Sequence, residues 1–105
     1  METTEKKITS MLKKYPNRIP LIIKTQNTNI AQLKKSKYMV PNNMKIGNIL
    51  HLIRTKIGLK SEEALFLFSN NTLLQTSLPI NEAYKLYASK DKILYIDYNI
   101  ENTFG

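Results

Sequence analysis

The chain has 105 residues, no cysteine and a net charge of +8. This length allows one domain with a single modest core, and the missing cysteine excludes disulfides, thiolate metal clusters and cysteine nucleophiles. The longest apolar runs are far shorter than the roughly 18–20 residues of a bilayer-spanning helix, so membrane attachment would require a chemical modification or a partner. Residues 1–60 carry 13 basic and 2 acidic side chains, against 3 basic and 6 acidic ones in residues 61–105. The basic half is either an ordinary solvated surface or a site for acidic peptides, anionic lipids or nucleic acids.

The first half of the chain predicts a helix followed by two strands. Residues 1–15 carry apolar side chains at i, i+3, i+4 and i+7 from Ile8, which is the spacing of an amphipathic helix. Residues 18–24 are apolar on both faces, as is typical of a strand in the middle of a sheet. Residues 37–40 predict a short edge strand, because the Pro41 that follows lacks the N–H needed for a ladder hydrogen bond.

The second half predicts a helix over residues 44–57, ended by Gly58, and then further strands. Residues 64–69 and 92–98 predict apolar strands, separated by a turn, a short strand and a short helix that Pro79 opens. A hairpin, a crossing helix and then more strands is the order of the α+β β-grasp, or ubiquitin-like, fold. We therefore expect a mixed four-stranded sheet with an added N-terminal helix, in which the first and last strands pair in parallel.

The ends of the domain follow from the same elements. One ubiquitin-like domain should span residues 1–98, with its N-terminal helix at residues 1–15, and leave residues 99–105 as a flexible C-terminal tail. Such a tail is ordinarily a frayed terminus. A tail that ends in a glycine, here Gly105, is also what a ubiquitin-type activating enzyme needs, because the carboxylate must thread a narrow channel that tolerates no side chain.

Candidate catalytic and metal-binding groups are scarce. His51 is the one histidine, and helical periodicity places it off the core face of its helix, where a solvated side chain is the ordinary interpretation. Without a cysteine or a second histidine, neither a metal cluster nor a nucleophile–base pair can be assembled. The acids have no obvious acid–base partners, and the glycines are isolated from one another. The sequence thus predicts no enzyme, no metal and no cofactor.

The helix at residues 44–57 carries a wider apolar stripe than one core needs. Its predicted core face consists of Ile46, Leu50, Ile53 and Ile57. Ile49 and Leu52 lie to one side of this face, next to Lys56. Either the sheet curls round to cover these two residues, or they line a groove that is open to a partner.

The edge strand at residues 37–40 also allows two interpretations. Lys34, Lys35 and Lys37 crowd it, and lysines on an edge strand discourage aggregation. The alternative is β-augmentation, in which an extended peptide adds a strand to the edge, places apolar side chains in pockets and brings its acids to the lysines.

Several motifs occur along the chain in a fixed order. The most specific are Tyr15-Pro-Asn-Arg-Ile-Pro20 and Lys37-Tyr-Met-Val-Pro41, followed by Glu63-Ala-Leu-Phe-Leu-Phe68, Leu94-Tyr-Ile-Asp-Tyr98 and a final Phe104-Gly105. Together they resemble the GABARAP and light-chain-three family of ubiquitin-like autophagy modifiers, and the resemblance runs from about residue 13 to the end.

The resemblance implies a function for the tail. Gly105 would be activated by an E1-like enzyme, passed to E2-like enzymes and joined to phosphatidylethanolamine, with a deconjugating protease acting at the same end. The protein would be a monomer that binds no nucleic acid and moves from the cytoplasm to the autophagosomal membrane once it is lipid-anchored. Its partners would include cargo receptors that carry short aromatic-x-x-aliphatic motifs.

The resemblance also implies two pockets for such a motif. The first, for the aromatic residue, would be lined by Met11, Pro20, Ile22, Lys37, Met39 and Ile93. The second, for the aliphatic residue, would be lined by Tyr38, Val40, Pro41, Met44, Ile49, Leu52 and Ile53, flanked by Lys56. Phe66 and Phe68 match aromatic residues that face the processing protease and some partners, although they could equally belong to the core.

Two departures from the family pattern modify these expectations. The N-terminus is shorter, so the family's first short helix should be missing or vestigial. Lys7 occupies a position at the pocket rim that is commonly acidic, which should favour more acidic partner motifs.

Two rival functions stand beside this one. A modifier joined to a protein lysine also ends in an aromatic residue and a glycine, but it lacks the Tyr-Pro-x-Arg-Ile-Pro opening. A basic nucleic-acid-binding domain rests on charge alone, because the tyrosines are dispersed and no aromatic-rich RNA-binding signature occurs.

Overall fold

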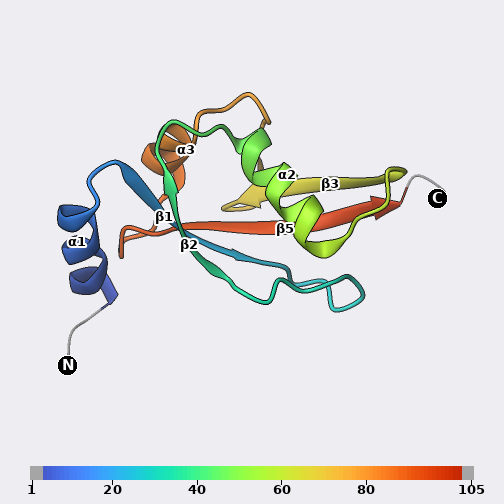
Figure 1. Ribbon diagram of the computed structural model, residues 1–105, viewed down its shortest axis with the longest axis horizontal. Coiled ribbons are helices and arrows are strands. Elements are labelled where there is room, and N and C mark those ends of the chain that lie inside the picture. Colours follow the sequence, from blue (N-terminus) through green and yellow to red (C-terminus); the bar gives the residue numbers. More distant parts are fainter. Residues whose placement is uncertain (1–3, 103–105) are drawn as a thin grey trace.

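The computed structural model describes residues 4–102 and follows the predicted order of elements (Figure 1). The helices are α1 (Thr4–Lys14), α2 (Ile46–Ile57) and α3 (Ile80–Tyr87). The strands are β1 (Arg18–Lys24), β2 (Lys37–Pro41), β3 (Glu63–Ser69), β4 (Thr72–Leu73) and β5 (Leu94–Asn102).

The strands form one mixed sheet in the order β2-β1-β5-β3-β4. β1 and β5 pair in parallel at its centre and the other pairs are antiparallel, which confirms the predicted β-grasp fold. The sheet has five strands instead of the predicted four. The fifth is the predicted short strand, the two-residue β4, which joins the sheet by returning along β3 after a tight turn at Asn70 and Asn71. Both asparagines have a positive φ, the conformation that a tight hairpin requires.

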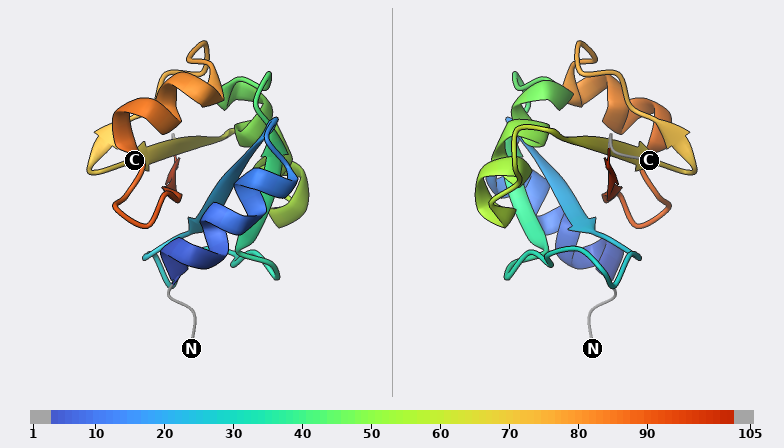
Figure 2. Two further views of the ribbon diagram at one scale, coloured as in Figure 1. Left: turned by 90° about the vertical axis from the view of Figure 1, so that its left-hand side faces the viewer. Right: turned by 90° about the vertical axis from the view of Figure 1, so that its right-hand side faces the viewer.

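Different helices cover the two faces of the sheet (Figure 2). Side chains alternate along a strand, so each strand supplies both faces. One face packs against α2 and α3 and forms the core, which includes Leu21, Ile23, Leu65, Leu67, Leu94, Ile96 and Tyr98. The N-terminal helix α1 lies over β1 on the opposite face and buries Ile8 there. The strand residues that face α1 are therefore not covered by α2 and α3, and they can contribute to a binding site.

The end of β5 departs from the predicted domain boundary. The tail was expected from residue 99, but β5 continues to Asn102. The reason is pairing with β3, where Ala64 lies opposite Glu101 and Leu65 lies opposite a half-buried Ile100. Residues 103–105 lie outside the described part of the chain.

The buried face of α2 also differs from the predicted one. Its fully buried residues are Ile46, Ile49 and Ile53, whereas Leu50 and Ile57 are only half-buried. The covered face is thus rotated toward Ile49 relative to the prediction. The helix ends as predicted at Gly58, whose φ of 66° is the left-handed conformation that glycine adopts without strain.

Candidate functional site

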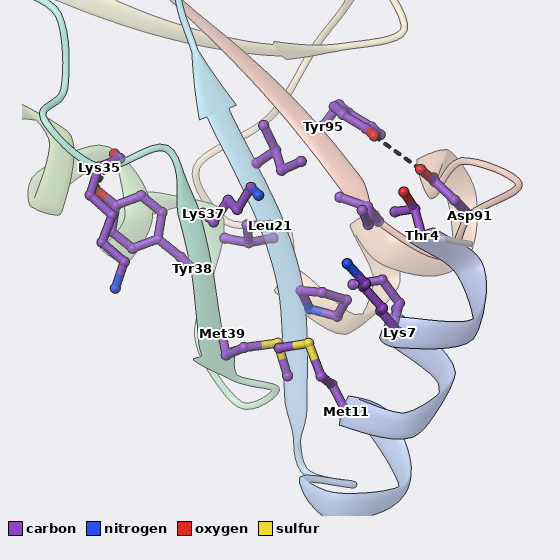
Figure 3. Close-up of a pocket in the computed structure, with 14 residues that line it drawn as sticks. Thr4, Lys7, Met11, Leu21, Lys35, Lys37, Tyr38, Met39, Asp91 and Tyr95 are labelled. Atoms are coloured by element: carbon purple, nitrogen blue, oxygen red, sulfur yellow. Dashed lines mark hydrogen bonds between the residues drawn. The ribbon is translucent and has the colours of Figure 1, made fainter. Parts of the chain in front are cut away.

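A cavity of about 580 Å³ lies between α1, the β1–β2 pair and the beginning of β5 (Figure 3). All six residues of the predicted aromatic pocket line it: Met11, Pro20, Ile22, Lys37, Met39 and Ile93. The strand register explains this convergence, because Pro20 pairs with Met39 and Ile22 pairs with Lys37 on the face away from the core. α1 adds Met11 from across the cavity.

The mouth of the cavity is basic. Lys7, Lys35 and Lys37 line it, and all three are exposed. Lys35 is held near the edge of the sheet, since its Nζ lies 5.1 Å from the ring centroid of Tyr38. The hydroxyl of Tyr38 in turn donates a hydrogen bond to the carbonyl oxygen of Lys35 at 2.8 Å. This rim would attract acidic groups of a ligand.

Several further residues line the cavity that the sequence reasoning missed: Thr4, Ile8, Leu21, Asp91 and Tyr95. Tyr95 reaches the cavity because it pairs with Ile22 in the parallel β1–β5 ladder. Its hydroxyl donates a hydrogen bond to Asp91 Oδ2 at 3.1 Å. Burial raises the pKa of Tyr95, and the hydrogen bond to Asp91 and its negative charge raise it further. The alternation of Leu94, Tyr95 and Ile96 was the available signal, but it required the β1–β5 register.

Part of the predicted aliphatic pocket is buried in the core. Three of its members, Val40, Ile49 and Ile53, lie in the core, and Ile49 and Ile53 have no exposed surface. Of the two interpretations of Ile49, the covered one is therefore correct. The remaining members are partly or fully exposed: Tyr38, Pro41, Met44, Leu52 and Lys56. Tyr38 also lines the cavity described above, although it was predicted for the aliphatic pocket.

The predicted edge strand is an edge strand. β2 is the outermost strand of the sheet and pairs with β1 on one side. Its outer backbone edge lies between the cavity on the α1 side and the partly exposed residues on the α2 side. An extended peptide added here would meet both surfaces.

The other predicted site residues lie away from this edge. Phe66 and Phe68 are half-buried and alternate along β3 with the buried Leu65 and Leu67, so they belong to the face opposite the core. His51 is exposed, as expected for a solvated helix residue. Gly105, the predicted conjugation site, lies outside the described residues.

Two further properties of residues 4–102 concern membranes and metal ions. No helix in this range has the length and apolar character of a membrane span. No group of three or more histidine, cysteine, aspartate or glutamate side chains in the same range is arranged to hold a metal ion.

Comparison with known proteins gives a consistent picture. The family model described as "Autophagy protein Atg8 ubiquitin like" matches residues 3–105. Autophagy-related protein 8h of Arabidopsis thaliana is 38% identical over 95% of this chain and 85% of its own length. Autophagy-related protein 8 of Vanderwaltozyma polyspora is 40% identical over 88% of this chain and 79% of its own.

Two solved structures resemble the fold closely. ATG8 of Trypanosoma brucei superimposes with a TM-score of 0.86 at 30% identity, over 97% of this chain and 89% of that one. Plasmodium falciparum Atg8, solved in complex with a Plasmodium falciparum Atg3 peptide, superimposes with a TM-score of 0.83 at 30% identity, over 94% and 89% of the two chains. Proteins of this family are ubiquitin-like modifiers and not enzymes. The chain belongs to the Atg8 family of ubiquitin-like autophagy proteins.

Proposed function

We propose that this protein is joined through Gly105 to phosphatidylethanolamine on autophagosomal membranes, and that its β2 edge binds aromatic-x-x-aliphatic motifs of cargo receptors. E1-like and E2-like enzymes would attach it and a protease would release it from the lipid. The unconjugated form would be a cytoplasmic monomer. The observation that carries the peptide-binding part is that the six residues which the family resemblance implies for the aromatic pocket all line one cavity, beside the outer edge of β2.

The geometry of β2 fits a motif with this spacing. Side chains alternate along a strand, so residues three apart point to opposite faces and lie about 10 Å apart along it. A peptide paired with β2 would therefore place its aromatic residue in the cavity on the α1 side. Its aliphatic residue would reach the α2 side, where Met44 and Leu52 are partly exposed. Backbone hydrogen bonds to the β2 edge would set the register.

The aromatic and aliphatic residues of the motif should not contribute equally to binding. The cavity already exists, whereas the α2 side offers partly exposed side chains over a filled core. The aliphatic residue would thus pack on a shallow surface unless Leu52 and Met44 move. The acids that often flank such motifs would meet Lys7, Lys35 and Lys37 at the cavity mouth.

The peptide complex of the Plasmodium relative supports the proposal, because it shows that a protein with this fold binds a peptide. Chemical-shift mapping with a motif peptide tests it here. We expect the shifted amides to cluster on β1, β2 and α1, with little change around the exposed Leu86 on α3. Replacing the aromatic residue of the peptide by alanine should abolish the pattern. Shifts centred on α3 or on Phe66 would contradict the assignment.

The conjugation part has its own test. Gly105→Ala should abolish covalent attachment to membranes in cells and leave thermal stability unchanged, because position 105 lies beyond the last residue of β5. Intact mass measurement of the membrane-bound pool reports the lipid directly. A Gly105→Ala protein that still carries lipid would refute the conjugation site. If the wild-type Gly105 is instead found joined to a lysine of another protein, the rival function is favoured.

A further inference from the structure

Asp91 occupies a fixed position at one end of the cavity. It lies in the loop between α3 and β5, where the Ser89 amide donates a hydrogen bond to the Ile93 carbonyl at 2.9 Å and the Lys92 amide donates one to the Ser89 carbonyl at 3.0 Å. The Ser89 hydroxyl hydrogen-bonds to Asp91 Oδ1. Lys92 completes the turn with a φ of 66°, in the left-handed region. These bonds hold the carboxylate in place before any ligand arrives.

The carboxylate of Asp91 has acceptor capacity to spare. A carboxylate can accept about four hydrogen bonds, two on each oxygen. Oδ1 accepts one from the Ser89 hydroxyl, and Oδ2 accepts one from the Tyr95 hydroxyl at 3.1 Å. Asp91 is only half-buried and lines the cavity, at the end near Thr4 and Tyr95 (Figure 3). Its unused lone pairs are thus within reach of a side chain that enters the cavity.

The other lining groups make Asp91 distinctive. Among the described residues that line this cavity, it is the one carboxylate. The basic lining residues, Lys7, Lys35 and Lys37, donate hydrogen bonds and cannot accept them. A donor carried by the ligand therefore finds its strongest acceptor at Asp91, and such charge-assisted hydrogen bonds are about twice as strong as neutral ones.

We propose that Asp91 determines which aromatic residue the cavity accepts, by taking a hydrogen bond from an indole N–H or a phenol O–H. This inference rests on the peptide-binding function proposed above. Tryptophan and tyrosine then bind better than phenylalanine, which fills the apolar part of the cavity but displaces water from the carboxylate without replacing its hydrogen bond. Because Asp91 is half exposed, the expected preference is moderate, about 5- to 30-fold.

Matched peptides test this selectivity. Two motif peptides that differ only by tyrosine or phenylalanine at the aromatic position differ by one hydroxyl group. A second pair compares tryptophan with naphthylalanine, a ring of similar size that lacks the N–H. Calorimetry with the full-length chain should show tighter binding of the donor-bearing peptide in each pair, by about 5- to 30-fold.

Three variants locate the acceptor. Asp91→Asn, which keeps the shape but removes the charge, should reduce both preferences to less than about threefold. Asp97→Asn is the matched control, because Asp97 lies on the strand β5 that follows the Asp91 loop and does not line the cavity. It should leave both preferences unchanged. Tyr95→Phe removes the hydroxyl that competes for Asp91 Oδ2 and should keep or increase them.

The outcomes separate this inference from the proposed function. If the wild-type protein binds both members of a pair equally, or if the preference survives Asp91→Asn, the peptide site stands and the role of Asp91 is wrong. A preference lost in Tyr95→Phe but kept in Asp91→Asn would assign the acceptor to Tyr95 and equally overturn the inference. If none of the four peptides binds the wild-type protein, both the inference and the peptide-binding function fail. Melting curves of Asp91→Asn show whether the loop remains folded, and Asp91→Glu, which restores the charge, should recover part of the preference.

Discussion

The surfaces on the two sides of β2 differ in how open they are to a partner. On the α1 side a cavity is open, because Ile8 is the one residue that α1 buries along Thr4–Lys14. On the α2 side, Ile46, Ile49 and Ile53 have no exposed surface. A preformed cavity takes a ligand without moving side chains, whereas a filled face must rearrange first. The aromatic residue of a motif should therefore supply more binding free energy than the aliphatic one.

The largest expected effect is on folding and tests whether the α2 side is filled. Ile49→Ala should lower the free energy of unfolding by about 2–5 kcal/mol, because it opens a cavity in a fully buried position. Leu52→Ala, at a half-buried position one turn away, should lower it by less than about 1.5 kcal/mol. Urea denaturation measures both. Equal losses would mean that the α2 side is less tightly packed than the structure indicates.

The second prediction compares the two sides in binding. Met39→Ala, which removes part of the wall on the α1 side, should weaken a motif peptide by about 1–2 kcal/mol. Leu52→Ala on the α2 side should weaken the same peptide by less than about 1 kcal/mol. Calorimetry under one set of conditions gives both values. The reverse order would show that the α2 side opens on binding and differs in conformation between the free and the bound protein.

The third prediction concerns Tyr98, which anchors the filled side. Its hydroxyl donates a hydrogen bond to the Ala31 carbonyl at 2.7 Å and accepts one from the Leu33 amide at 3.2 Å. Tyr98→Phe removes both of these hydrogen bonds to the β1–β2 connection and should lower the free energy of unfolding by about 1–3 kcal/mol. Peptide affinity at the α1 side should change little.

Tyr98 should also contribute to alkaline unfolding. Burial raises the pKa of Tyr98 in the folded protein, and the charges of Tyr38 and Asp97 add to the increase, although the Leu33 amide opposes it. The folded state therefore resists ionisation. Its stability is fully present below the unfolded tyrosine pKa of about 10 and is lost as the pH rises through the higher folded value. The loss of stability above pH ~10 should be smaller in Tyr98→Phe than in the wild type. If the free energy of unfolding falls equally with pH in both proteins, Tyr98 ionises no less readily in the folded state.

The smallest expected effect concerns the basic rim, where single exposed pairs contribute about 0.2–1 kcal/mol. Lys7→Glu should slow the association of an acidic peptide and leave a neutral peptide nearly unchanged, and the difference should shrink as salt is added. Stopped-flow rates for one acidic and one neutral peptide at two salt concentrations measure this. Equal losses for both peptides would mean that Lys7 acts through packing of α1 and not through its charge.

The sequence predicts the elements and their order well, because each has its own apolar periodicity and its own stop signal. It misses features that depend on register. Ile49 lies to one side of the core face on a helical wheel, yet it is fully buried in the core. Residues 99–102 look like a polar tail, but β3 provides a partner strand for them.

The candidate site likewise combines residues that could be predicted from the sequence with residues that could not. The aromatic pocket was predicted from a resemblance to a family, and the pairing of β1 with β2 brings its residues together. Asp91 and Tyr95 were not predicted as site residues. Asp91 sits in a loop whose conformation depends on hydrogen bonds among Ser89, Lys92 and Ile93, and Tyr95 faces the cavity because of its pairing with β1. The loop is formed by local hydrogen bonds, but the pairing of β5 with β1 joins segments that are far apart in the sequence.

The elongated shape of the molecule would set a condition on the receptors proposed above. α1 and the end of β5 lie at opposite ends of the long axis, which measures 46 Å (Figure 1). If the C-terminal end is the membrane anchor, the cavity can be displaced from the bilayer by much of that length. A disordered receptor segment has a typical reach of about 5–6 Å times the square root of its residue number, so about 70 residues span this distance without stretching. A receptor that is itself embedded in the same membrane must therefore place its motif far along a flexible segment, whereas a receptor on approaching cargo needs almost none. Linker length would thus distinguish receptors in the same membrane from those on cargo, whatever their motif sequences.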